Sequence, residues 1–223
     1  MGMPDGLNFE QAATLGLGTI TVGQGLYQKA MQLDLPSASP EKKKENVLIY
    51  GGGTATAALG IQFARQSGYS VVTICAPANY DYVKSLGVDL ALDFQEENVG
   101  AKIRRYTSDK LRFVWDTIEI PPTAQICADA LTTQSDLQPA YGAVNPSTCP
   151  RSDVKSTSTV MYTVFGKAFE FGPQHMPAST ENHEFGKRFY RIAEELYAKV
   201  STSPQQLERY RSAKQSVCAI RAW

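Results

Sequence analysis

Short runs of apolar residues recur along the first two thirds of the chain, and stretches with helical spacing separate them. Within each run, Val, Ile and Leu follow one another instead of alternating with polar residues. A strand of a parallel sheet is covered on both faces and shows this continuous pattern. We therefore expect buried strands at 47–50, 70–75, 90–94 and 111–116.

Helices of about ten residues connect these expected strands. The first one ends near Gly68, at the position where a left-handed C-terminal cap is expected. Strands that alternate with such helices predict right-handed crossovers and a doubly wound parallel sheet, an α/β fold of Rossmann type. The other expected helices run from Asn79 to Gly87, from 96 to 106 and from Pro121 to about Leu131.

The patterns at the two ends of the chain are weaker. We expect helices at 8–16, 19–31 and 181–199, strands at 140–144 and 160–166, and loops at 33–45 and 134–155. These patterns predict a helical lead-in at 1–45, a Rossmann domain at 46–200 and an atypical tail at 201–223, to which no structure is assigned.

Composition narrows the class of protein. Hydrophobic residues make up 43% and charged residues 20% of the 223, which is typical of a globular protein. The formal net charge is +0, which argues against a polyanionic partner such as a nucleic acid. No apolar run approaches the roughly 20 residues that span a bilayer, and the N-terminus has no basic segment followed by an apolar one. We expect a cytoplasmic protein without membrane contact.

The four cysteines and two histidines do not suggest a metal site. Cys75, Cys127, Cys149 and Cys218 are far apart, contain no Cys-x-x-Cys pair and have no histidine nearby in sequence. This spacing supports neither a disulfide framework nor a zinc site, so buried free thiols and no bound metal are expected.

The candidate chemistry lies where the first strand breaks into Gly51-Gly52-Gly53 and the small residues that follow. Glycines let the backbone turn sharply and let a phosphate approach its N–H groups, while a helix N-terminus supplies unpaired donors. The hydroxyls of Thr54 and Thr56 can donate as well. As a dinucleotide fingerprint the motif is incomplete, because Thr56 or Ala57 replaces the third glycine, and a glycine-rich turn without ligand remains the alternative.

The second strand indicates which dinucleotide would bind. An Asp or Glu about 20 residues after the fingerprint holds the ribose 2′-hydroxyl of NAD, but 73–76 contains no acid. The absence favours NADPH and argues against a methyltransferase that uses S-adenosylmethionine. Asn79, Tyr80 and Lys84 are near enough in sequence to contact the 2′-phosphate. Asn79 could equally cap a helix, and the two roles are compatible.

At this point the chain resembles the medium-chain dehydrogenases and reductases (the zinc-type alcohol dehydrogenase-like family), and within them the stand-alone, trans-acting enoyl reductases of fungal polyketide biosynthesis, a part of secondary metabolism. The resemblance covers about 8–199. It rests on Gln11-Ala12-Ala13, Thr19 to Tyr27, Gly51 to Ala57, Val83 to Asp89, Trp115 to Ile118 and Tyr162 to Gly166.

The resemblance implies roles for particular residues. Gly53, Thr54, Ala55 and Thr56 would hold the pyrophosphate of NADPH, Ala76, Pro77, Ala78 and Asn79 would surround the 2′-phosphate, and Phe94 would lie near the adenosine. Ala76 replaces the usual serine and Phe94 the usual tyrosine, which removes two hydroxyls. Thr19, Ile20, Thr21, Val22, Gly23, Gln24, Gly25, Leu26, Tyr162, Thr163, Val164, Phe165 and Gly166 would line the substrate side. For Val22 and Val164, core packing is an equal alternative.

The resemblance also implies a reaction. An NADPH-dependent oxidoreductase of this kind reduces an α,β-unsaturated acyl thioester on the acyl carrier domain of a polyketide synthase. The family begins with a barrel-like catalytic domain, so we expect a truncated chain with a single cofactor-binding domain. The alternative is a catalytically inactive nucleotide-binding remnant or partner-binding module. No catalytic residue or proton donor is assigned, and a zinc alcohol dehydrogenase does not fit because its Cys and His ligands are missing.

Overall fold

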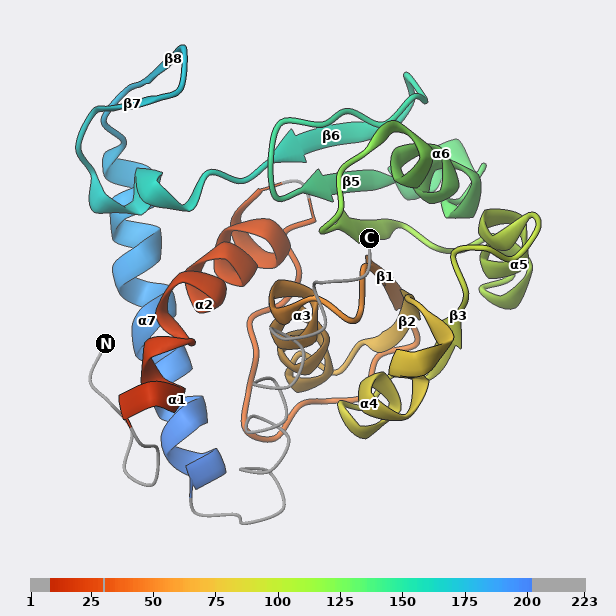
Figure 1. Ribbon diagram of the computed structural model, residues 1–223, viewed down its shortest axis with the longest axis horizontal. Coiled ribbons are helices and arrows are strands. Elements are labelled where there is room, and N and C mark those ends of the chain that lie inside the picture. The colour runs from red at the N-terminus through yellow and green to blue at the C-terminus, as the bar shows by residue number, and fades with distance from the viewer. Residues whose placement is uncertain (1–8, 30, 202–223) are drawn as a thin grey trace.

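Six parallel strands form the central sheet of the protein, for which a computed structural model describes residues 9–29 and 31–201 (Figure 1). Their order is β3-β2-β1-β4-β5-β6, the order found in dinucleotide-binding Rossmann folds. The predicted doubly wound parallel sheet is confirmed. The strands are β1 (Asn46–Tyr50), β2 (Ser70–Ile74), β3 (Leu90–Leu92), β4 (Phe113–Asp116), β5 (Ala140–Ala143) and β6 (Lys155–Ser158).

The sheet separates two hydrophobic clusters, and this explains the continuous apolar runs. Val47 and Ile49 of β1 join the cluster on one face, whereas Leu48 and Tyr50 join the cluster on the other. All four are at most 4% exposed. Successive side chains of a strand point to opposite faces, so a strand covered on both sides needs apolar residues at every position.

Helices cover both faces of the sheet (Figure 1). The helices α2 (Gly16–Val22), α3 (Ala55–Gln66), α4 (Tyr80–Ser85) and α7 (Thr180–Ser201) contribute to one cluster. The helices α5 (Val99–Tyr106) and α6 (Pro121–Ala130) pack together and contribute to the other. The predicted helix at 181–199 and the left-handed Gly68, with φ of 84°, are both confirmed.

The N-terminal segment packs through its glycines. After the short α1 (Phe9–Ala13), α2 continues as the π-helical segment η1 (Gly23–Gln28). A Cβ at Gly25 would lie 2.6 Å from Nε1 of Trp115, and one at Gly18 would lie 2.6 Å from Cδ1 of Leu59. The glycines therefore let this helix approach the sheet and α3 more closely than any larger residue would allow.

The predicted strand at 160–166 is wrong. The segment forms a short 3₁₀ helix, η4 (Met161–Phe165), which ends at the left-handed Gly166 with φ of 70°. Tyr162 and Phe165 are 42% and 62% exposed, so the apolar run is not enclosed between two layers as a buried strand would be.

Three strands were not predicted. Strand β6 begins at the last residue of the expected loop 134–155 and continues to Ser158, and its polar residues are tolerated because it pairs only with β5 at the sheet edge. Strands β7 (Phe169–Phe171) and β8 (Gln174–Met176) form an antiparallel hairpin around Gly172, whose φ is 60°. The start of the first expected helix, at Asn8, and residues 202–223 of the predicted tail lie outside the described residues.

Cys75, Cys127 and Cys149 are buried free thiols, as predicted, and burial raises the pKa of Cys75 to about 11. Cys218 lies outside the described residues. Within the ranges that the structure describes, we find no helix with the length and hydropathy to cross a membrane. The same ranges hold no cluster of three or more His, Cys, Asp or Glu residues arranged to bind a metal ion.

Candidate functional site

The glycine turn lies between β1 and α3, at the point where the strand order reverses. The N–H groups of Gly51 and Gly52 donate to the carbonyl of Ile74 at the end of β2, at 2.9 and 3.1 Å. Gly51 has a φ of 86°, and a Cβ there would lie 2.6 Å from Oγ1 of Thr117, which follows β4. The turn is thus held between the ends of β2 and β4, where parallel α/β sheets bind their ligands.

Thr54 begins α3 as its N-cap. Its backbone is extended and its hydroxyl accepts a 3.1 Å hydrogen bond from the N–H of Ala57. The hydroxyl of Thr117 donates to the carbonyl of Tyr50 at 2.8 Å and lies 3.1 Å from Oγ1 of Thr54. Because the only hydrogen of Thr117 is used, Thr54 donates its own to Thr117. The hydroxyl of Thr54 is therefore engaged within the protein, which leaves the backbone N–H groups of the first helical turn as the donors for a phosphate.

We expect Thr54→Ala to lower the free energy of unfolding by about 1 kcal/mol, the usual loss when a helix cap is removed. The variant also removes the hydrogen bond from Thr54 to Thr117, whose hydroxyl keeps its bond to the carbonyl of Tyr50. Thr54→Ser keeps the acceptor and should stay close to wild type. Urea denaturation followed by circular dichroism measures both, and an equal loss for the two variants would contradict the capping role.

The loop after β2 contains the residues predicted to surround the 2′-phosphate. Ala76 leads into the 3₁₀ turn η2 (Pro77–Asn79), which continues into α4. Asn79 makes no side-chain capping bond, so its predicted capping role is wrong. The reason is local: the 3₁₀ turn already gives Asn79 a φ of −97° and a ψ of 0°, whereas a capping residue needs an extended backbone.

The side chain of Asn79 instead packs against the glycine turn, because a Cβ at Gly53 would overlap its amide nitrogen. The structure therefore brings together two segments that were predicted to bind the phosphates. Phe94 follows β3 and is half-buried against the same cluster as Leu90 and Leu92. Lys84 lies in the last turn of α4, the six-residue helix that follows this loop.

No acid occurs at 73–76, but Asp81 lies in the first turn of α4, and Asp93 and Glu96 follow β3. Glu96 accepts a 2.7 Å hydrogen bond from Lys102, and this bond lowers the pKa of Glu96. Burial, together with the charges of Glu96 and Asp93, raises the pKa of Tyr80. Lys102 offsets one of these charges.

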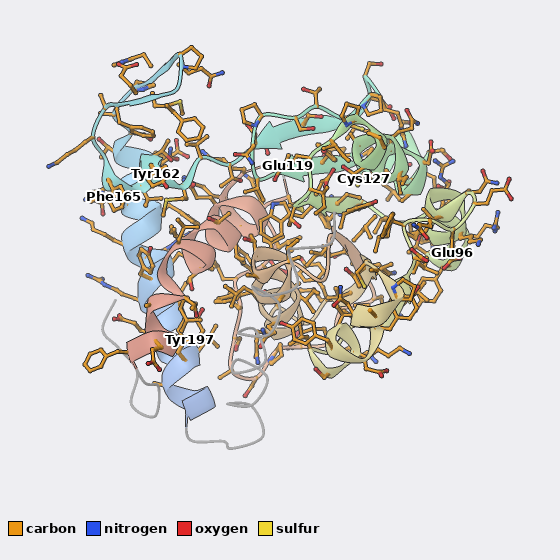
Figure 2. The ribbon with its side chains drawn as sticks, viewed as in Figure 1. Glu96, Glu119, Cys127, Tyr162, Phe165 and Tyr197 are labelled. Carbon is orange, nitrogen blue, oxygen red and sulfur yellow. The ribbon has the colours of Figure 1, made fainter. Side chains whose placement is uncertain are left out.

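The structure also brings together the two segments predicted to line the substrate side. Nε2 of Gln24 in η1 donates to Oγ1 of Thr163 in η4 at 3.0 Å. The residues at 18–26 are buried, so their contacts in the described structure are packing contacts. Thr19, for example, hydrogen bonds to the hydroxyl of Tyr197 in α7 at 2.7 Å. Of the predicted substrate-side residues, Tyr162 and Phe165 present the largest exposed surfaces (Figure 2).

A buried network joins the end of β4 to β5 and α6 through residues to which the sequence assigned no role. Asp116 is fully buried and accepts hydrogen bonds from Oγ1 of Thr123 at 2.6 Å, from the hydroxyl of Tyr141 at 3.0 Å and from the N–H of Ile118 at 2.9 Å. Burial, with the charge of Asp116, raises the pKa of Tyr141. This network fixes the path of the loop that carries Thr117 beside the glycine turn. The Trp115-Asp116-Thr117-Ile118 motif was the available sequence signal.

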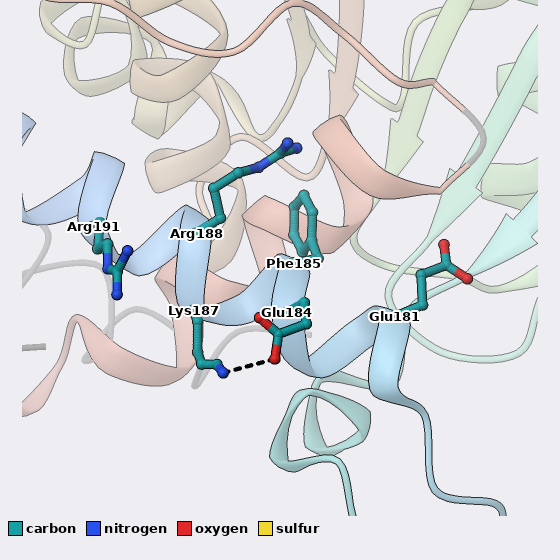
Figure 3. A pocket seen from close by; sticks show the side chains of 6 residues that line it. All are labelled: Glu181, Glu184, Phe185, Lys187, Arg188 and Arg191. Atoms are coloured by element: carbon teal, nitrogen blue, oxygen red, sulfur yellow. Dashed lines mark hydrogen bonds and ion pairs between the residues drawn. The ribbon is translucent and has the colours of Figure 1, made fainter.

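A separate hollow of about 500 Å³ lies on the outer side of α7 (Figure 3). Its charged walls include the ion pair of Lys187 with Glu184 at 2.7 Å, and the guanidinium of Arg188 lies 6.0 Å from the centre of the Phe185 ring. None of the predicted cofactor or substrate residues lines it.

Comparison with known proteins identifies relatives, although no family model matches the chain. Trans-enoyl reductase resD of Aspergillus sclerotiorum is 39% identical over 210 residues, which cover 87% of this chain and 57% of that protein. Trans-enoyl reductase TOXD of Cochliobolus carbonum is 43% identical over 167 residues, which cover 75% and 54%. The chain is a homologue of the fungal trans-enoyl reductases. This confirms the resemblance inferred from the sequence motifs.

The trans-enoyl reductase relatives also include lovC of Aspergillus terreus, the enoyl reductase component of lovastatin nonaketide synthase. It is 36% identical over 203 residues, which cover 87% of this chain and 54% of lovC. The chain thus spans a little over half the length of these relatives.

Solved structures share the fold of the chain. CurK enoyl reductase superposes with a TM-score of 0.69 at 14% identity, over 97% of this chain and 62% of CurK. Mycobacterial Rv1454c complexed with NADPH gives 0.60 at 18% identity, over 96% and 64%. At these identities the likeness establishes the fold alone.

Proposed function

We propose that this chain is the NADPH-binding part of a trans-acting enoyl reductase that acts on α,β-unsaturated acyl thioesters carried by a polyketide synthase. The observation that carries the proposal is the glycine turn of a Rossmann sheet, held between Thr117 and Asn79, in a homologue of trans-enoyl reductases. The lovC name, which describes a component of a polyketide synthase, supports the choice of partner.

The residues at the site fit a dinucleotide phosphate. Gly52 and Gly53 leave the backbone accessible where a Cβ would fill the space beside Thr73 and Asn79. The first-turn N–H groups of Ala55 and Thr56 have no partner within the helix and would hold the pyrophosphate. The loop of Ala76 to Asn79 would surround the 2′-phosphate. When bound, NADPH supplies the hydride for the β-carbon of the unsaturated thioester.

The choice of NADPH over NADH rests on charge. Thr73 is buried, with its hydroxyl 2.6 Å from the carbonyl of Ile49, and no carboxylate follows at the end of β2. An acid there would bind a ribose 2′-hydroxyl and repel a 2′-phosphate. We expect the dissociation constant for NADPH to be at least about tenfold lower than that for NADH, a difference of about 1.4 kcal/mol.

Titration of the chain with each reduced cofactor, followed by nicotinamide fluorescence, measures this preference. Tighter binding of NADH would contradict the assignment. Turnover is then measured as NADPH oxidation in the presence of an enoyl thioester of pantetheine, with this chain fused to the catalytic domain of a related reductase. If the fused protein binds NADPH and does not oxidise it, the chain is a nucleotide-binding protein and the reductase assignment fails.

A further inference from the structure

A carboxylate bridges the loops at the carboxyl ends of β4 and β5. Nδ2 of Asn145, just after β5, donates a 2.7 Å hydrogen bond to Oε2 of Glu119, in the loop between β4 and α6. The backbone N–H groups of Val144 and Asn145 also favour the charged form of this carboxylate. Figure 2 shows Glu119 beside the ends of β5 and β6.

Both the backbone conformation and the partial burial of the Glu119 carboxylate are unfavourable. Its φ is 62°, in the left-handed region that residues other than glycine rarely adopt. Its side chain is half-buried, and burial together with the charge of Asp116 raises the pKa of its carboxyl group. Within 9–29 and 31–201, the ion pairs of the structure leave Glu119 without a cationic partner. Backbone strain of this kind is concentrated at functional sites.

The position of Glu119 indicates what it could bind. A dinucleotide crosses a Rossmann sheet at the point where the strand order reverses, with one half on each side. The glycine turn and Asn79 lie on the β1–β2 side, and Glu119 and Asn145 lie on the β4–β5 side. The second side would receive the nicotinamide half, whose ribose has free 2′- and 3′-hydroxyls and no 2′-phosphate. A carboxylate accepts hydrogen bonds from such hydroxyls.

We propose that Glu119 binds a ribose hydroxyl of the nicotinamide half of the cofactor, and that Asn145 positions the carboxylate for this contact. The proposal rests on the proposed function and extends it to the second half of the site. It also explains why the absence of an acid at 73–76 is compatible with an acid after β4, because only the adenosine ribose of NADPH carries a 2′-phosphate.

Two substitutions of Glu119 separate this binding role from a structural one. Glu119→Gly removes the carboxylate and relieves the backbone strain, so the fold should become more stable while binding weakens. Glu119→Gln removes only the charge. For both variants we expect NADPH and NADH to bind about tenfold or more weakly, the usual effect of losing a hydrogen bond to a charged group. Adenosine 2′,5′-bisphosphate, which lacks the nicotinamide half, should bind as it does to wild type.

Gln138→Gly is the matched control. Gln138 also has a positive φ, of 50°, but it lies before β5, at the amino ends of the strands and not at their carboxyl ends. The Gln138→Gly variant should be more stable than wild type and should bind NADPH, NADH and adenosine 2′,5′-bisphosphate with unchanged affinity. Binding is measured by isothermal titration calorimetry and stability by thermal unfolding.

Two results would overturn the assignment of Glu119. One is an affinity of Glu119→Gly for NADPH equal to that of wild type. The other is an equal loss of affinity for adenosine 2′,5′-bisphosphate, which would mean that Glu119 shapes the whole site. Failure of the wild-type chain to bind either ligand is a separate outcome, and it would overturn the proposed function together with this assignment.

Discussion

Replacing Phe189 with alanine should lower the free energy of unfolding by about 3–5 kcal/mol, the usual cost of removing a buried Phe ring. Phe189 is fully buried in α7. Its ring centre lies 5.3 Å from that of Tyr27 in η1, 5.6 Å from that of Phe63 in α3 and 5.7 Å from that of Phe185. The ring thus joins three helices on one face of the sheet, and the cavity left by alanine cannot close without moving all three.

Urea denaturation, followed by tryptophan fluorescence, measures this loss. Phe9→Ala provides the matched control, because Phe9 is 82% exposed and its removal should change the free energy of unfolding by less than about 0.5 kcal/mol. Similar losses for the two variants would show that α7 does not depend on this aromatic contact.

The fold could be predicted from sequence wherever a strand is covered on both faces. In β1, all of Val47, Leu48, Ile49 and Tyr50 are buried, so the apolar run itself reports two packed layers. Helix α7 was predictable for a related reason. Only one of its faces packs on the protein, and residues such as Phe185, Phe189 and Leu196 recur at helical spacing along that face.

The errors occurred where the tertiary environment overrides local pattern. Strand β6 is polar, since it lies at the sheet edge and its stability comes from backbone pairing with β5. The run at 160–166 resembles a strand in composition, but it follows the last strand of the sheet and turns at Gly166 toward α7. Neither fact can be read from a window of a few residues.

Within the candidate site, the residues that are neighbours in sequence could be predicted, and those brought together only by the fold could not. Thr54 and the glycines form one continuous turn, so their spacing in sequence was enough to locate them. Thr117, Glu119 and Asn145 come from loops after two other strands, and only the strand order brings Thr117 beside that turn and Glu119 beside Asn145. The sequence could predict that Asn79 and Gly53 lie near the same phosphates, but not that they touch. The 3₁₀ turn that directs the Asn79 side chain has no clear sequence signal.

Replacing Thr56 with leucine should weaken NADPH binding by about 100-fold, or about 2.7 kcal/mol, while the fold stays intact. Thr56 is the second residue of α3, and a helical side chain leans back over the turn that precedes it. At this position a leucine would cover the glycine turn and the N–H groups of the first turn. A phosphate oxygen must come within about 3 Å of those nitrogens to be held there. Leucine has a higher helix propensity than threonine, so α3 itself should not be weakened.

Thr180→Leu provides the matched control for the change in bulk. Thr180 is the exposed first residue of α7, directly after Ser179, whose hydroxyl accepts from the N–H of Asn182 at 3.1 Å. The same substitution is thus made in the first turn of a second capped helix, but away from the glycine turn. Fluorescence titration with NADPH should give an unchanged dissociation constant for Thr180→Leu and a much higher one for Thr56→Leu. Equal dissociation constants for both variants and wild type would mean that the phosphates are held elsewhere, since no pyrophosphate could reach the first turn of α3 past a leucine at position 56.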